Sequence, residues 1–387
     1  MNKLFNVTDT IKYVGVDDKE MDLFENQYIL KNGISYNSYL IDDEKIVIMD
    51  TVDKRKTKEW LENLEKTLNG RNPDYLVISH LEPDHSGSIE DVLRKYPEMK
   101  IIANEKVFSM LPQFINEKFD DKKVVVKEGD IINTGKHNLQ FIMTPMVHWP
   151  EVMMTYNVTE KILFSADAFG KFGTLDTEEE WIDESRRYFL NIVGKYGLQV
   201  QNVLKKASNL DIKTICPLHG PILKENLGYY IGLYDTWSKY EYEQEGTVIV
   251  CGSLHGNTLE AAKKLERDLI EDGQIVKLID IARTPVPDAL PEAFKFSKMV
   301  VACSTYNMSI FPAINSFLNL LKEKNYQSRK VGIIENGSWA PNAANCIKNI
   351  LSQMKDIEII EPVVTIKTKL NEESNKKLEE LEKSLQL

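Results

Sequence analysis

Short apolar runs, several of them followed closely by a residue that could bind a ligand, mark the first 245 residues of the chain. The runs span 46–50, 75–79, 124–126, 139–143, 161–165 and 212–217. Their length and their content of Val, Ile and Leu predict β-strands. Four of them lead into His80, His148, Asp167 and His219. Since strands hold the loops that carry chemistry, we expect a functional site at these strand ends.

The pattern changes from Thr247 onward. Apolar runs at 247–251, 274–281, 298–304, 330–336 and 357–364 alternate with helical segments that begin near Thr258, Pro312, Pro341 and Asn371. This alternation predicts a doubly wound parallel sheet. The polar stretch 238–246 separates the two patterns, and we interpret it as a linker. The sequence therefore predicts two domains, 1–245 and 246–387.

The segment HLEPDH, residues 80–85, concentrates possible metal ligands. Because it contains Pro83, a regular helix is not expected there, and the segment is predicted to be a loop. A single histidine or carboxylate in such a loop is more simply explained as solvated surface. The strand-end residues enlarge the set, which then comprises His80, Glu82, Asp84, His85, His148, Asp167 and His219. His137, in the polar turn 134–140, is expected to be exposed.

Seven candidate ligands are too many for one first-row ion with an open position, but they suit two metals that share a carboxylate. The set contains four imidazoles and three carboxylates and no evident thiolate. This mixture favours iron or manganese, while zinc stays an alternative.

A second constellation follows the strand at 247–251. The segment 252–262, GSLHGNTLEAA, places small and hydroxyl residues where a helix is expected to begin, so its N–H groups with Ser253 and Thr258 could hold a phosphate. An ordinary capped helix explains this segment equally well. Two later strand-end loops, 303–312 and 335–343, add Tyr306 and Trp339, on which a flat ring could stack. The candidate cofactor-binding residues are Ser253, Leu254, His255, Gly256, Asn257, Thr258, Ser304, Thr305, Tyr306, Asn307, Asn336, Gly337, Ser338 and Trp339.

Charge and cysteine content narrow the function classes. Lys and Arg total 48 against 59 Asp and Glu, a net charge of −11, which argues against nucleic-acid and membrane-surface partners. No signal peptide or membrane-spanning run is apparent, so we expect a soluble, cytoplasmic protein. The four cysteines are scattered without a C-x-x-C pair. We therefore expect neither a disulfide framework nor a rubredoxin-like centre of the chain's own, and electrons would have to come from a separate donor.

The motifs of the first half resemble those of the metallo-β-lactamase-like fold. They are HLEPDH, VHWPE (147–151), SADAFG (165–170) and CPLHGP (216–221), and the segment 33–41 is also similar. Glu82, in place of the usual middle histidine, resembles the flavodiiron branch of that fold. The resemblance implies one iron at His80, Glu82 and His148, a second iron at Asp84, His85 and His219, and Asp167 as the bridge. A histidine that many members carry upstream is missing from 23–33, which leaves the substrate preference open.

The second half resembles flavodoxin. Ser253 and residues 256–258 match its phosphate loop, although His255 stands where threonine is common. The two resemblances imply an N-terminal αββα sandwich, a C-terminal flavodoxin-like sheet, FMN and two irons. They further imply a reductase that passes electrons from a rubredoxin-like donor through FMN to the diiron centre, with no separate protein nucleophile. Dioxygen reduction to two waters needs four electrons, and coupling two nitric oxides to nitrous oxide needs two. The implied assembly is a homodimer or a dimer of dimers.

Two other functions compete with this interpretation. One is a dinuclear metallohydrolase fused to a flavodoxin-like module, which Glu82 argues against. The other is an electron-carrier flavoprotein whose first half is only structural, which leaves the seven candidate ligands without a role.

Overall fold

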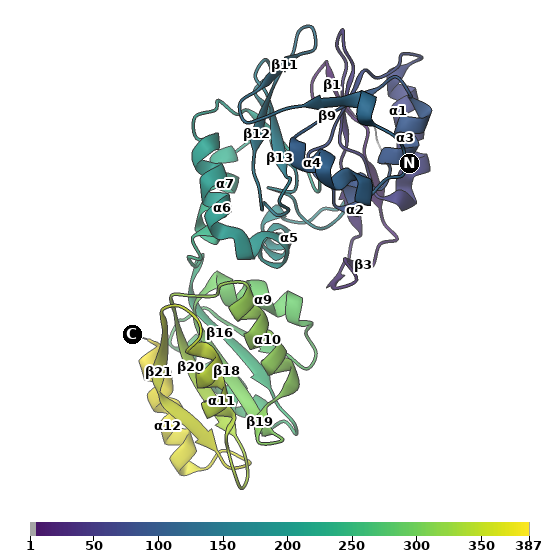
Figure 1. Cartoon of the computed structure of the whole chain (residues 1–387). Coiled ribbons are helices and arrows are strands. Elements are labelled where there is room, and N and C mark those ends of the chain that lie inside the picture. The colour runs from purple at the N-terminus through teal and green to yellow at the C-terminus, as the bar shows by residue number, and fades with distance from the viewer. Residues whose placement is uncertain (1–4, 387) are drawn as a thin grey trace. The chain divides into compact units, whose positions relative to one another are not determined.

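The computed structural model describes residues 5–386, which divide into two compact units (Figure 1). Residues up to Phe189, together with Leu198–Asp235, form the first unit. Leu190–Gly197, together with the residues from Thr236 onward, form the second. The chain therefore passes between the units three times, because a short segment from the middle of the sequence belongs to the second unit.

Two sheets form the centre of the first unit. One has the strand order β1-β6-β7-β8-β9-β10 and the other the order β11-β12-β13-β14-β15. Strands β6, β7, β13 and β15 are buried along their whole length, so both faces of each sheet need cover. The strands are β1 Ile11–Tyr13, β6 Tyr39–Ile41, β7 Val47–Met49, β8 Tyr75–Val77, β9 Lys100–Ala103, β10 Lys123–Val125, β11 Ile131–Asn133, β12 Asn138–Met143, β13 Met153–Asn157, β14 Ile162–Phe164 and β15 Thr214–Cys216.

Helices supply that cover, which confirms the expected αββα sandwich. Figure 1 shows α1 and α3 beside the first sheet and α6 and α7 beside the second. Two short strand pairs, β2 with β5 and β3 with β4, complete the unit. The bounds are α1 Thr57–Leu68, α2 Pro83–Ser86, α3 Ile89–Lys95, α4 Glu105–Met110, α5 Trp181–Tyr188, α6 Gly197–Ala207, α7 Leu227–Ser238, β2 Val16–Asp18, β3 Leu23–Phe24, β4 Tyr28–Ile29 and β5 Ile34–Tyr36.

The loop expected over residues 80–85 is partly wrong, because Pro83–Ser86 forms one helical turn, α2. Pro83 occupies the first position of that turn. Proline is favoured there, since the N–H that it lacks would have no partner within the helix. The turn presents Asp84 and His85 from consecutive positions.

His137 is buried, contrary to the exposed position expected for it, and its side chain is 1% exposed. Its Nδ1 accepts a hydrogen bond from Asn157 Nδ2 at 3.0 Å. The turn folds onto the carboxylate of Asp43, which accepts from the His137 N–H at 3.0 Å and from the Thr134 hydroxyl at 2.8 Å. Burial raises the pKa of Asp43, but these hydrogen bonds outweigh burial and hold that pKa below its usual value. Hydrogen bonds to the buried Asp43 carboxylate thus hold this turn inside the protein, although its polar composition suggests a solvent-exposed position.

A parallel sheet forms the centre of the second unit, in the order β17-β16-β18-β20-β21. This is the flavodoxin-like strand order, so the doubly wound prediction is confirmed. Helices α8 and α12 share one hydrophobic cluster with the sheet, and α10 packs beside both α9 and α11. The bounds are β16 Gln244–Gly252, β17 Val276–Asp280, β18 Phe296–Tyr306, β19 Ser309–Ile310, β20 Arg329–Asn336, β21 Ile357–Ile366, α8 Asn257–Glu271, α9 Val286–Lys295, α10 Pro312–Glu323, α11 Ala343–Leu351 and α12 Glu372–Leu385.

Helix α9 was not among the helical segments expected from the sequence. Prolines near its start and Pro291 inside it mask the helical pattern. Within the described residues 5–386, no helix is long and apolar enough to cross a membrane.

The segment Leu190–Gly197 is joined to the rest of the second unit by specific hydrogen bonds. Asn191 Nδ2 donates to the Pro287 carbonyl at 3.0 Å, and Asn325 Nδ2 donates to the Lys195 carbonyl at 3.0 Å. Leu190 and Val193 are fully buried. The backbone of 189–193 is wound as a π-helix, a form that is rare outside functional or strained positions.

Candidate metal centre and cofactor pocket

The ends of four strands bring the candidate metal ligands to one place in the first unit. His80 follows β8, Asp167 follows β14, His219 follows β15, and His148 lies between β12 and β13. Helix α2 and the residue before it add Glu82, Asp84 and His85. Ala166, next to Asp167, has a left-handed backbone with φ 51°. Such strain is typical of residues held in place for function.

The seven side chains form two groups. The first contains His80, Glu82, His148 and Asp167, and the second contains Asp84, His85 and His219. In the first group, Glu82 Oε2 lies 3.3 Å from His80 Nε2 and 3.1 Å from His148 Nε2. In the second, His219 Nε2 lies 3.0 Å from His85 Nε2 and 3.1 Å from Asp84 Oδ2.

Asp167 faces both groups, with one carboxylate oxygen toward each. Its Oδ2 lies 3.1 Å from His80 Nε2 and 3.4 Å from His148 Nε2. Its Oδ1 lies 3.7 Å from both His85 Nε2 and His219 Nε2. This is the arrangement of a carboxylate that can bridge two ions.

The spacing and burial of these atoms fit metal ions. Two ligand atoms about 2.1 Å from one ion and at right angles to each other lie about 3.0 Å apart, close to the separations found within each group. Both carboxylate oxygens of Asp84 and of Asp167 are buried without a hydrogen-bond donor in the described chain. Buried carboxylates need compensation, and a cation between the facing nitrogens and oxygens would provide it.

The charges of the site depend strongly on one another. Burial lowers the pKa of His148, but Asp167 and Glu82 outweigh burial and raise it to about 9. Burial raises the pKa of Asp167, yet the positive charge of His80 and the contact with His148 hold it well below its usual value. The Asp167 carboxylate therefore stays ionised at neutral pH and can accept a cation.

A hairpin made by β3 and β4 lies against this site. The Phe24 ring packs edge-on to the His219 imidazole, with centroids 5.7 Å apart. Glu25, at the hairpin tip, has its pKa raised to about 8 by desolvation and by the charge of Glu82. In the segment where the sequence lacks the expected histidine, the structure thus places a carboxyl group next to a candidate ligand. Nothing in the local composition of 23–33 indicated this proximity.

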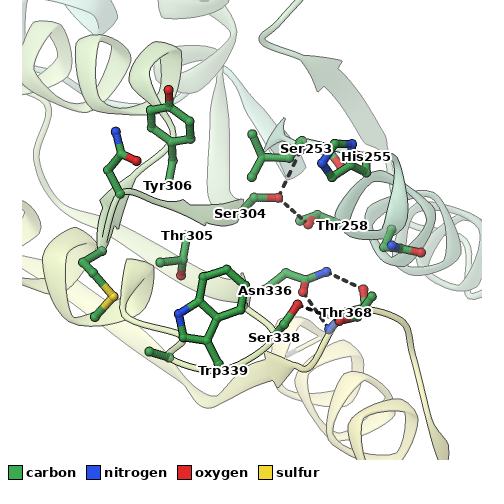
Figure 2. A pocket seen from close by; sticks show the side chains of 16 residues that line it. Ser253, His255, Thr258, Ser304, Thr305, Tyr306, Asn336, Ser338, Trp339 and Thr368 are labelled. Carbon is green, nitrogen blue, oxygen red and sulfur yellow. Dashed lines mark hydrogen bonds between the residues drawn. The ribbon is translucent and has the colours of Figure 1, made fainter.

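A cavity of about 410 Å³ opens at the carboxyl ends of the strands in the second unit (Figure 2). All the residues expected to bind a cofactor line it except Gly256, which precedes α8 with φ 92°. Glycine adopts this left-handed backbone without strain. Three further residues line the cavity: Met308 and Ala340 lie within the expected loops 303–312 and 335–343, whereas Thr368 lies outside them. Thr368 follows the last strand, so only the sheet order could have brought it into the prediction.

Hydroxyl groups and a helix start define one side of this cavity. Thr258 and Ser304 hydroxyls lie 2.9 Å apart, and the Leu254 N–H donates to Ser304 Oγ at 3.2 Å. The Gly256 N–H donates to Ser253 Oγ at 3.1 Å. In Figure 2, Tyr306 and Trp339 lie on the other side. Trp339 is 89% exposed, which leaves its ring free to cover a ligand.

Comparisons with known proteins cover both units. Residues 34–220 match the family described as the ODP family beta lactamase. The chain is 32% identical to an uncharacterised protein of Methanocaldococcus jannaschii, across 99% of this chain and 98% of the relative. It is 29% identical to the anaerobic nitric oxide reductase flavorubredoxin of Aliivibrio salmonicida, across 90% of this chain and 72% of the relative. The solved flavodiiron protein of Giardia intestinalis superimposes with a TM-score of 0.90 and 25% identity, across 100% of this chain and 95% of that one.

The chain belongs to the flavodiiron protein family. The flavodiiron match extends over both units, so the fold and the order of the units are those of the family. Family membership confirms the resemblance seen in the motifs around residues 80–85 and 147–151.

Proposed function

We propose that this chain is a gas reductase that takes electrons from an external donor through FMN and uses them at two irons. The substrate is dioxygen, nitric oxide or both. The observation that carries the proposal is the position of Asp167, whose two oxygens face two separate groups of buried donors.

Two irons fit the donor set better than zinc does. Each group offers two imidazoles and one carboxylate, with Asp167 shared, and no cysteine is among the grouped residues. We assign His80, Glu82 and His148 to one iron, Asp84, His85 and His219 to the other, and Asp167 to both. Mixed imidazole and carboxylate ligands suit iron, whereas thiolates and all-imidazole sets are more typical of zinc.

FMN fits the cavity of the second unit. The start of α8, with Ser253 and Thr258, would hold the phosphate, because the N–H groups at a helix start favour an anion. Tyr306 and Trp339 would flank the flavin ring. The cavity has a volume of about 410 Å³, which lies in the range of cofactor and ligand pockets, roughly 300–1,000 Å³.

When bound, the flavin supplies one- and two-electron transfer and the irons supply gas binding and further electrons. The residues of the chain retain the ions and orient their ligands. Buried carboxylates keep the site anionic enough to retain the ions, and Phe24 and Tyr188 pack their rings against His219. These rings restrict the orientation of the imidazole and keep water away from it.

We further propose a rubredoxin-like protein as electron donor. The family resemblance implies it, and a relative of this chain is named flavorubredoxin. Cys251 and Cys303 lie on the neighbouring strands β16 and β18, and none of the groups of candidate metal ligands among the described residues contains a cysteine.

The proposed function predicts two irons and one FMN per chain in protein purified without added metal. With a chemically reduced rubredoxin under anaerobic conditions, this protein should consume added oxygen, added nitric oxide or both. Metal analysis, flavin analysis and gas electrodes measure these quantities on one preparation. NADH alone should support only slow turnover. Zinc at full occupancy in protein that still reduces either gas would contradict the proposal.

We also propose a homodimer, because the two candidate sites belong to separate units while electrons must cross a short gap. A two-fold dimer can set the flavin of one chain against the irons of the other. A mixture of an iron-deficient variant, Asp167→Ala, and a flavin-deficient variant, Ser253→Asp, should then regain activity after subunit exchange. Light scattering and tagged subunits verify the exchange. Verified mixed dimers without activity would exclude transfer between chains.

A further inference from the structure

The two groups of candidate iron ligands are equal in donor type but differ in what lies behind them. Each has two imidazoles and one carboxylate, and Asp167 contributes one oxygen to each. The ligands alone therefore give the two ions nearly equal charge. Any difference between the ions has to come from the groups that contact the ligands.

A carboxylate lies directly behind His80. Glu151 Oε1 accepts a hydrogen bond from His80 Nδ1 at 3.2 Å and another from the Leu81 N–H at 2.9 Å. Glu151 is 1% exposed, and its Oε2 has no hydrogen-bond donor in the part of the chain that the structure describes. With an ion bound, this carboxylate would hold the remaining proton of His80 on Nδ1 and leave Nε2, which faces Glu82 and Asp167, to bind the ion.

The imidazoles of the second group have no such support. His219 Nδ1 donates to the backbone carbonyl of Ser35, a neutral acceptor, at 2.7 Å. His85 Nδ1 is buried without a hydrogen-bond partner among residues 5–386. Aromatic rings surround this pair, since Tyr36 contacts both imidazoles and Tyr188 contacts His219. Apart from the candidate ligands themselves, the contacts of these two imidazoles named here are thus with neutral groups.

We propose that Glu151 is a positioning residue that makes the two irons unequal, so that the iron at Asp84, His85 and His219 takes up the first electron. A buried negative charge hydrogen-bonded to a ligand imidazole makes that imidazole a stronger donor. It also stabilises the more highly charged ferric ion, and a buried interaction of this kind is weakly screened. The iron at His80 is therefore harder to reduce than its neighbour. This inference rests on the proposed function, because it presupposes that both irons are bound.

The test is a redox titration of the full-length, ⁵⁷Fe-loaded protein, followed by Mössbauer and EPR spectroscopy. The wild type should show two separate one-electron steps, with a half-reduced form that holds one ferric and one ferrous iron. Glu151→Gln keeps the shape and an acceptor for the His80 proton but removes the charge. The lower midpoint should rise and the upper one stay, so that the half-reduced form loses at least tenfold in stability, or about 59 mV of separation.

Two further variants control this comparison. Glu128→Gln removes an exposed carboxylate of the same unit that pairs with Lys206, and it should leave both midpoints unchanged. Glu151→Asp retains the charge and should keep the midpoints closer to the wild type than the glutamine variant does. An unchanged separation in iron-loaded Glu151→Gln, or a rise of the upper midpoint instead, overturns the inference.

The redox titration of the wild-type protein tests the inference even if Glu151→Gln fails to fold or to bind iron. A wild-type protein that reduces both irons at one midpoint overturns the inference. Wild-type protein that binds no iron contradicts the proposed function itself. Unequal irons in the iron-loaded wild type together with a glutamine variant without effect overturn the inference about Glu151 and leave the proposed function standing.

Discussion

Asp167→Ala is expected to lower gas-reductase activity more than about 100-fold and to reduce the iron content. Even the removal of a hydrogen-bond partner of a metal ligand costs about 10- to 100-fold in affinity or activity, and Asp167 is a candidate ligand with an oxygen toward each group. Without it, two positive ions would lose the carboxylate between them. Metal analysis and gas consumption on the same preparation measure both effects.

The flavin content of Asp167→Ala should equal that of the wild type, because the flavin cavity belongs to the other unit. Asp43→Asn is a matched control, since Asp43 is also a buried aspartate of the first unit but accepts its hydrogen bonds from the turn 134–137, which contains none of the candidate ligands. This control should lose stability and keep its iron. An Asp167→Ala protein with two irons and full activity would refute the bridging assignment.

Ser253→Asp is expected to weaken FMN binding by about a thousandfold. Ser253 Oγ accepts the Gly256 N–H, and an aspartate at the same position can also accept it, so the loop should keep its conformation. The new charge would face the phosphate. At about 4 Å and an effective dielectric constant of about 20, one pair of like charges costs about 4 kcal/mol, which is about three powers of ten in affinity.

Ser253→Asn separates charge from size in this test, because asparagine has nearly the shape of aspartate without its charge. It should bind FMN within about tenfold of the wild type. Fluorescence titration of the flavin-free proteins with FMN gives both constants, and iron content should be normal in both variants. Equal loss of affinity in the two variants would show that the phosphate does not lie at Ser253.

The elements that the sequence revealed are those whose patterns are local. Residues 248–251 and 299–303, inside two of the expected runs, are apolar and buried, as expected for strands covered on both faces, and both lie in parallel strands. Helix α9 was not predicted because its prolines obscure the helical periodicity of the sequence. Helix α2 was not predicted because proline is unfavourable inside a helix but favourable at its first position, where Pro83 lies.

The residues of the candidate site likewise fall into those that local sequence patterns indicate and those that only distant contacts bring into the site. His80, Asp167 and His219 could be found because each closely follows a recognisable strand. Glu151, Glu25 and Thr368 could not, because their relevance depends on contacts across 71, about 57 and about 30 positions of sequence. His137 was misjudged for the same reason, since the partner that buries its turn, Asp43, is 94 positions away.

The segment Leu190–Gly197 limits how the chain can be divided by genetic means. A fragment that begins at residue 246 would resemble a free-standing flavodoxin in sequence, yet it would lack the stretch that donates to the Pro287 carbonyl and buries Leu190 and Val193. A fragment that ends at 245 would carry that apolar stretch without its surroundings. Exchange of the flavin module of this chain therefore has to transplant two pieces of chain together, which makes such an exchange harder than a single fusion point suggests.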